Sequence, residues 1–107
     1  MPFTIKQNDT LPALVAVLKE TDGTPIDLTT ATGVQLVVKK ADGTGAWKKA
    51  AAFVTPRTEG KVQYNWVAAD TSNSGTFNAE FEIAWPGGIQ TVPNNNYFQI
   101  EVAEDLG

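Results

Sequence analysis

Hydrophobic and polar residues alternate along much of this chain with a period of two. In residues 76–85 the aromatic side chains and an isoleucine fall on one face, and two glutamates fall on the other. Residues 61–67 and 97–103 repeat the alternation. A period of two is typical of β-strands with one buried and one solvent-facing side. The pattern therefore predicts three half-buried strands.

Three further strands are expected from composition. Residues 13–20 and 34–40 are rich in Val and Leu, which predicts strands buried on much of both faces. Residues 46–54 predict another strand, whose register the alanines at 50–52 leave open. Shorter segments are expected to add pairings at sheet edges, at residues 3–7, 26–28 and 89–92.

Turn residues separate these runs. Asp42-Gly43 and Pro86-Gly87-Gly88 lie between adjacent strands and predict hairpins. About seven to eight short strands with regularly spaced turns predict the all-β class, as a sandwich of two antiparallel sheets. The 107 residues contain no linker, internal repeat or low-complexity segment. We therefore expect one domain over residues 1–107.

The chain contains no cysteine and no histidine. It therefore lacks disulfides, a thiolate nucleophile, the commonest metal ligand and the commonest general base. Ser72 and Ser74 are its only serines, and they are better explained by turn formation. Glu80 and Glu82 share a face of one strand, but a solvated face carries such charges in any case. We predict that the protein is not an enzyme and uses no cofactor.

The acidic residues are scattered rather than gathered in one loop, as a calcium site requires. No metal site is therefore predicted. Two of these residues, Asp9 and Asp70, are expected instead to cap tight turns through hydrogen bonds from the backbone to their carboxylates.

Charge also limits the partners. Eight Lys or Arg against twelve Asp or Glu give a net charge of −4, and an acidic surface repels the phosphate backbone of nucleic acids. No apolar run approaches the length of a membrane span, and no secretory signal is visible at the start. We expect a protein made in the cytoplasm that binds neither nucleic acid nor membrane.

Four apolar residues are the candidates for contact with a partner protein: Phe3, Ile5, Trp47 and Trp85. The third tryptophan is not among them. Trp66 is in phase with buried neighbours, so it is assigned to the core. Trp47 and Trp85 lie next to turns, where an aromatic side chain either caps the core or anchors a partner. Phe3 and Ile5 belong to the short segment 3–7, the best candidate for strand exchange with a partner.

Several segments, in this order and spacing, resemble one protein family. These segments are residues 5–12, 22–29, 60–66, 70–71 and 75–81, the last ending in the pair Glu80-Phe81. Together they resemble the N-terminal domain family of the phage baseplate upper protein, and the resemblance spans nearly the whole chain. The resemblance implies an immunoglobulin-like sandwich in the virion of a tailed phage, with an assembly role and no catalysis.

A structural virion protein that binds other virion proteins is the leading hypothesis. Such a protein is expected in the tail or baseplate or at the neck. Because the chain ends once the sandwich is complete, a stand-alone copy could also sit elsewhere on a virion, such as the neck, the tail or the capsid surface. Two alternatives stay open, a carbohydrate- or host-surface-binding module and a capsid decoration protein. Association with further copies of itself is also left open.

Overall fold

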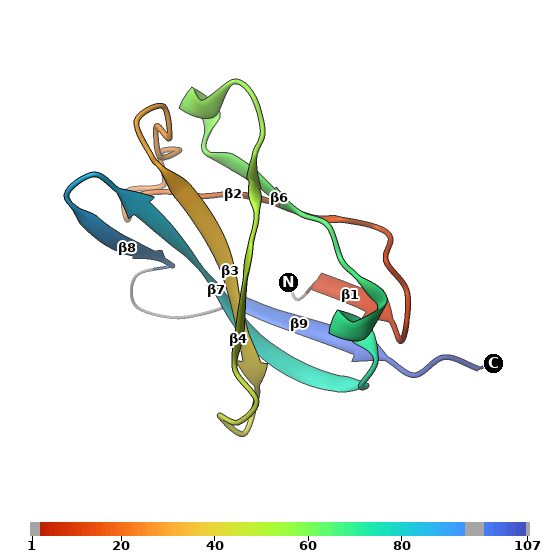
Figure 1. Ribbon diagram of the computed structural model, residues 1–107. Helices are drawn as coiled ribbons and strands as arrows, with labels where there is room; N and C mark the ends of the chain where they lie inside the picture. Colours follow the sequence, from red (N-terminus) through yellow and green to blue (C-terminus); the bar gives the residue numbers. More distant parts are fainter. Residues whose placement is uncertain (1–2, 94–97, 107) are drawn as a thin grey trace.

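The computed structural model describes residues 3–93 and 98–106, and the described part of the chain is built from strands and two short 3₁₀ turns (Figure 1). The strands are β1 (Phe3–Lys6), β2 (Leu14–Val17), β3 (Gly33–Lys40), β4 (Trp47–Ala50), β5 (Ala52–Phe53), β6 (Lys61–Tyr64), β7 (Gly75–Trp85), β8 (Gly88–Val92) and β9 (Phe98–Ala103). The turns are η1 (Arg57–Glu59) and η2 (Ala68–Thr71). The all-β prediction is confirmed. Within the described ranges, no helix is long and apolar enough to cross a membrane.

Two sheets make up the fold. The larger has the order β1-β9-β7-β3-β4, with β8 also paired to β7, and the smaller has the order β2-β6-β5. The prediction of purely antiparallel sheets is wrong, because β1 pairs with β9 in parallel. Alternation along one strand shows which face is buried but not which distant strand lies alongside. The immunoglobulin-like topology stays a prediction.

The long strand β7 is the centre of the larger sheet. One of its edges pairs with β3 over eight residues. The other edge is shared, because β9 pairs with Gly75–Ala79 and β8 pairs with Phe81–Trp85. Both predicted hairpins are confirmed, since β3 leads into β4 through Asp42-Gly43 and β7 leads into β8 through residues 86–87. Tyr97, expected at the start of the last strand, lies outside the described residues.

The predicted strand over residues 46–54 is two strands in different sheets. β4 pairs with β3 of the larger sheet, and β5 pairs with β6 of the smaller one. The chain passes between the sheets at Ala51, whose N–H still donates to the Val34 carbonyl at 2.9 Å. Methyl side chains at 50–52 carry little preference for either face, which explains why periodicity did not locate this crossing. The segment 26–28 is also not a strand, although it makes backbone hydrogen bonds to Leu18 and Arg57.

The core lies between the two sheets, and both contribute to it. Its buried side chains are Ile5, Leu14, Leu18, Ile26, Leu28, Ala31, Val34, Leu36, Val38, Val62, Tyr64, Trp66, Ala79, Phe81, Ile83, Val92, Ile100 and Val102. The period-two prediction for 76–85 is confirmed at Ala79, Phe81 and Ile83. Burial on both faces is wrong for β2, where Val15 and Val17 are 51% and 42% exposed.

Aspartates followed two residues later by threonine organise three turns. In each, the carboxylate accepts hydrogen bonds from the backbone N–H and the hydroxyl of the threonine, and these bonds lower the pKa of the aspartate. The pairs are Asp22 with Thr24, Asp27 with Thr29, and Asp42 with Thr44. Turn formation therefore accounts for three of the scattered acidic residues.

Candidate interaction surfaces

The acidic side chains of the described residues do not gather into a metal site. No group of three or more His, Cys, Asp or Glu side chains among them could hold a metal ion. Glu80 and Glu82 lie on the outer face of β7, and Glu82 forms an ion pair with Lys48 at 3.2 Å. Glu82 is therefore ion-paired on a partly exposed outer face, where the sequence predicted solvated charges.

Four aromatic rings form a row that joins the two sheets. Trp47 of β4 lies 5.9 Å from Tyr64 of β6, between ring centroids, and Tyr64 lies 5.1 Å from Trp66 in an edge-to-face contact. Phe3 of β1 stacks on Trp66 at 5.8 Å. Such pairs add to the stabilisation from burial alone. Tyr64 and Trp66 are buried in the middle of the row, so the core assignment of Trp66 is confirmed.

Three of the four candidate contact residues lie in or near this row. Phe3 and Trp47 stand at its two ends and are half-buried. Ile5 is 3% exposed and packs in the core. Strand exchange through β1 would therefore remove Ile5 from the core and Phe3 from its stack. A role of these residues in partner contact stays a prediction.

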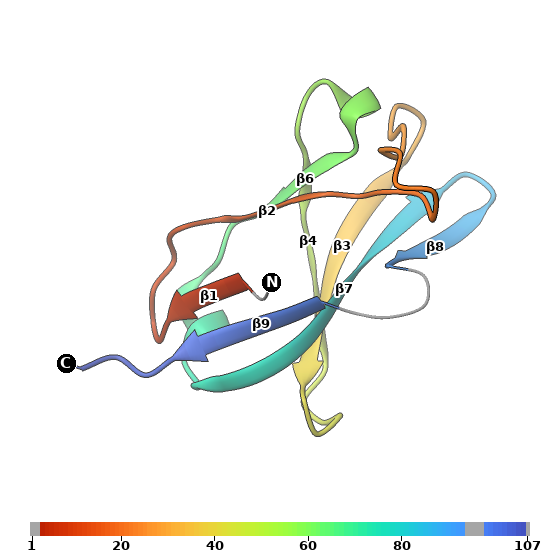
Figure 2. The same ribbon diagram turned by 180° about the vertical axis from the view of Figure 1, so that it is seen from behind.

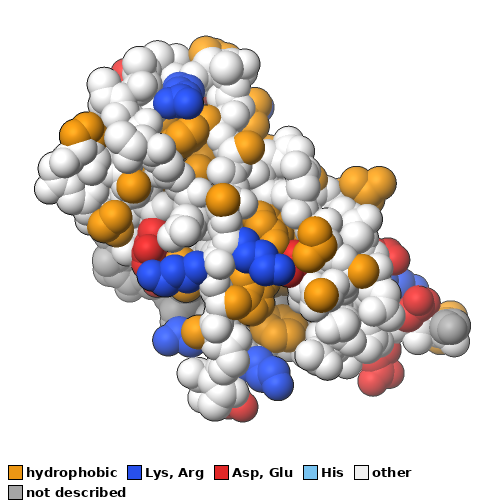
Figure 3. Space-filling model, in the orientation of Figure 1, with side chains coloured by type: hydrophobic (Ala, Val, Ile, Leu, Met, Phe, Trp, Pro, Cys, Tyr) orange, Lys and Arg blue, Asp and Glu red, His pale blue; other side chains and the backbone are white. Residues whose placement is uncertain are grey.

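The fourth candidate, Trp85, lies elsewhere, at the hairpin between β7 and β8. It is half-buried, and its indole N–H donates to the Gln90 side chain at 3.0 Å. Trp47 is also partly covered, since the Lys49 ammonium lies 5.4 Å from its ring centroid. In Figure 3, basic side chains (Lys or Arg, blue) lie across hydrophobic surface in the middle of the face that is shown. The indoles of Trp47 and Trp85 thus have intramolecular contacts and are only partly exposed.

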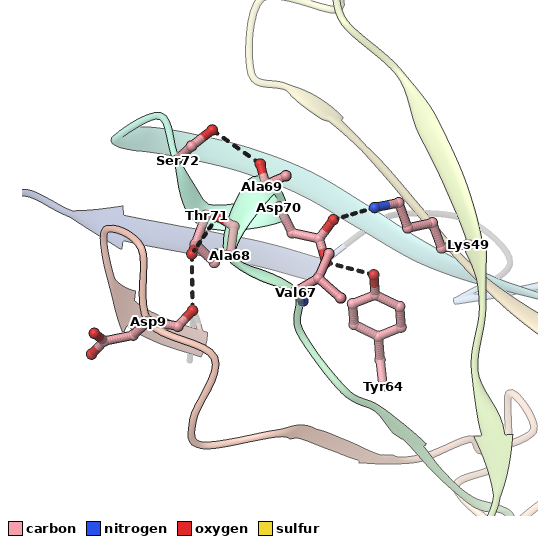
Figure 4. A network of polar contacts seen from close by, with 9 residues as sticks. All are labelled: Asp9, Lys49, Tyr64, Val67, Ala68, Ala69, Asp70, Thr71 and Ser72. Carbon is pink, nitrogen blue, oxygen red and sulfur yellow. Dashed lines mark hydrogen bonds and ion pairs between the residues drawn. The ribbon is translucent and has the colours of Figure 1, made fainter.

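A polar network centred on Asp70 lies beside the aromatic row (Figure 4). The carboxylate accepts hydrogen bonds from the Lys49 ammonium at 2.6 Å, the Tyr64 hydroxyl at 2.6 Å and the Val67 backbone N–H at 3.0 Å. Its side chain is only 2% exposed. Asp70 therefore closes the turn η2 and joins it to both sheets. The prediction that Asp70 caps a turn is confirmed, although its carboxylate accepts from the N–H three residues earlier rather than forming the expected Asx turn.

The same turn holds the segment between β1 and β2. The Thr71 hydroxyl, which is fully buried, donates to the Asp9 carbonyl at 2.9 Å, and the Asn8 N–H donates to the Thr71 carbonyl at 2.9 Å. The capping prediction for Asp9 is wrong, because its carboxylate has no hydrogen-bond partner among residues 3–93 and 98–106 and points away from the turn (Figure 4). The Asp9 backbone, rather than its side chain, is the part that is held.

The surroundings of this network lower the pKa of Asp70 and raise the pKa of Tyr64. Burial alone would raise the pKa of Asp70, but hydrogen bonds from Lys49, Tyr64 and Val67 outweigh burial, and its pKa lies below the usual range. Burial also raises the pKa of the Tyr64 hydroxyl, and the hydrogen bond to the Asp70 carboxylate raises it further. At neutral pH Asp70 is therefore charged and Tyr64 is protonated.

We expect acid to destabilise the wild-type protein more steeply than the variant Asp70→Asn. The Asp70 carboxyl has a lower pKa when folded than when unfolded, so the unfolded chain takes up the proton first as the pH falls. Its stabilisation is complete above the unfolded pKa of about 3.9 and is lost as the pH falls through the folded pKa. Urea unfolding at a series of pH values checks this. Equal pH dependence of the two proteins would contradict it.

The open edge of β2 is a feature that sequence reasoning missed. The Leu18 N–H donates to the Gly60 carbonyl at 2.8 Å, and the same antiparallel register continues along β2 and β6. Because hydrogen-bonded pairs alternate with non-bonded ones, the backbone groups of Val15, Val17 and Lys19 point away from β6. They have no hydrogen-bond partner in the described part of the chain.

A groove of about 430 Å³ runs beside this edge, between β2 and the β8–β9 side of the larger sheet. Its lining residues are Ala16, Val17, Leu18, Lys19, Glu20, Thr21, Phe81, Val92, Pro93 and Phe98. Figure 2 shows β2 as the outer strand of the smaller sheet, on the near side of the molecule. No sequence signal reveals this edge, because the side-chain pattern shows which face of a strand is exposed and not which strand lies alongside.

Comparison with known proteins identifies one family. The family model of the BppU N-terminal domain matches residues 2–106. The match thus includes both sheets, the aromatic row and the network around Asp70. No curated protein matches the sequence significantly.

Proposed function

This chain belongs to the BppU N-terminal domain family of phage baseplate structural proteins, and on that basis we propose that it acts by binding other proteins of the virion. The single observation that carries the proposal is the family match, which covers residues 2–106. Composition adds support, because the sequence has no His and no Cys, and the described residues hold no cluster of metal ligands. Binding through its surface is the role that such a domain can fill.

Within the virion, we place the protein in the baseplate rather than at the neck or on the capsid. The family of baseplate proteins supports this position. A glycan-binding module would stack sugar rings on exposed aromatic faces. Trp47 and Trp85 are instead half-buried, with intramolecular partners for both indoles. We therefore favour a protein partner over a carbohydrate.

Two measurements test this function. Gold-labelled antibody against this protein is expected to mark the tail tip of whole particles. The purified protein is expected to co-elute with at least one other baseplate protein on size-exclusion chromatography. Label confined to the head, or elution of the protein alone with every baseplate protein tried, would contradict the proposal.

A further inference from the structure

We propose that the open edge of β2 accepts a β-strand from another virion protein, which pairs with Val15–Lys19 and fills the groove beside them. This inference rests on the proposed function and specifies where and how a partner binds. Its partner is an extended segment with alternating side chains, and the recognition is the addition of a strand to a sheet edge.

The outer edge of β2 has backbone groups that an added strand could pair with. Val15, Val17 and Lys19 direct their N–H and C=O groups outward without partners in the described structure. They span roughly 13 Å at the rise of a strand. An added strand would satisfy these groups in the same manner as β6 satisfies the opposite edge.

Within Leu14–Val17, β2 lacks the charged side chains that normally protect sheet edges, although Lys19 ends the proposed edge. Charged side chains and very short length discourage an edge strand from pairing with another chain. The edge strand β4 carries Lys48 and Lys49, and the edge strand β5 spans only two residues. By contrast, β2 is the uncharged segment Leu14–Val17. Its exposed valines would lie beside the outward side chains of an added strand.

The groove supplies the specificity. Side chains of an added strand alternate between its two faces, so every second one would point inward. These would meet Phe81, Val92 and Phe98 on the larger sheet. At about 430 Å³ the groove has room for apolar side chains of ordinary size. We therefore expect the partner segment to carry Val, Ile, Leu or Phe at alternate positions.

A second copy of this chain does not fit the same edge well. Two copies meeting only along this edge would bury roughly 130 Å² each, from a length of about 13 Å and a spacing between sheets of about 10 Å. A stable interface needs about 800 Å² on each side. Moreover, Leu14 and Leu18 of a second β2 are already committed to their own core. A segment with uncommitted side chains suits the groove better.

The variant Val17→Pro tests the inference. The Val17 N–H points outward, so proline there removes no hydrogen bond of the native sheet, and edge strands tolerate proline in that orientation. It does remove a donor that the added strand needs. Val17→Thr is the matched control, because it keeps the N–H and the β-branched shape. Circular dichroism and thermal unfolding establish that both variants are folded.

The probe is a set of overlapping peptides tiled across the other baseplate proteins of the same particle, together with those intact proteins. We expect binding of one peptide to weaken roughly tenfold or more in Val17→Pro and to be unchanged in Val17→Thr. Amide exchange of Val15 and Val17 is expected to slow in the complex. Should Val17→Pro itself be unfolded, this exchange measurement on the wild-type protein decides the matter.

Three outcomes overturn the inference in distinguishable ways. If an intact baseplate protein binds both variants equally and leaves exchange at β2 unchanged, the site is wrong but the proposed function stands. If no baseplate protein or peptide binds the wild-type chain, both fail. If the chain forms a dimer that Val17→Pro abolishes, the occupant is a second copy rather than another protein.

Discussion

Replacing Gly60 by alanine is expected to destabilise the protein by about 3–5 kcal/mol. Gly60 is buried, ends η1 in the left-handed region at φ 70°, and leads into β6. A Cβ atom there would lie 2.7 Å from the Leu18 carbonyl oxygen and 2.9 Å from that of Ile26. Both neighbours are backbone atoms, so the chain itself would have to move. Chemical denaturation of the two proteins measures the loss.

Two other glycines separate the contributions to this loss. Gly43 also has a positive φ, of 88°, but a Cβ there would meet nothing within 4 Å. Gly43→Ala therefore isolates the backbone strain, about 1–2 kcal/mol. At Gly33 the backbone has no positive φ and an added Cβ would meet nothing within 4 Å, so Gly33→Ala is expected to change the free energy of unfolding very little. If Gly60→Ala cost no more than Gly43→Ala, the close approach of the two carbonyl groups would be unimportant.

The position of Gly60 illustrates what the sequence could and could not reveal. The pair Glu59-Gly60 marks a turn before a strand, and that much follows from local composition. The contacts with Leu18 and Ile26 come from segments that are distant in sequence. Similarly, alternation located β6, β7 and most of β9, because one face of each is buried and the other is not.

The predictions for residues 13–20 and for the four contact residues failed because local sequence does not show how distant segments pack. The run at 13–20 is largely apolar on both faces, which usually means burial on both faces, yet Val15 and Val17 are 51% and 42% exposed. The candidate site at the edge of β2 depends on the pairing of β2 with β6 alone, which alternation does not show. Of the four predicted contact residues, Ile5 is inside the core and the others are half-buried. Hydrophobic type alone does not distinguish a core side chain from an anchor.

The network around Asp70 was also beyond prediction from sequence, except for its turn. Lys49 and Tyr64 lie on different strands of different sheets, and only the packing of the sheets brings them to one carboxylate. Its arrangement leads to the second large effect. We expect Asp70→Ala to destabilise the protein by about 2–4 kcal/mol. The loss arises because the Tyr64 hydroxyl and the Val67 N–H would lose their acceptor.

Thermal and urea unfolding of a small set of variants can test the origin of this effect. Asp70→Asn keeps a carbonyl oxygen for one or two of the donors but loses the charge opposite Lys49, so its loss should be smaller than that of Asp70→Ala. In Tyr64→Phe the buried hydroxyl is absent, and Asp70→Ala should then cost less than in the wild-type background, by about 1 kcal/mol or more. Strict additivity of the two changes would show that the hydroxyl and the carboxylate do not depend on each other. In that case the stability of η2 would have to come from the hydrogen bonds of Thr71 and from packing against the segment between β1 and β2.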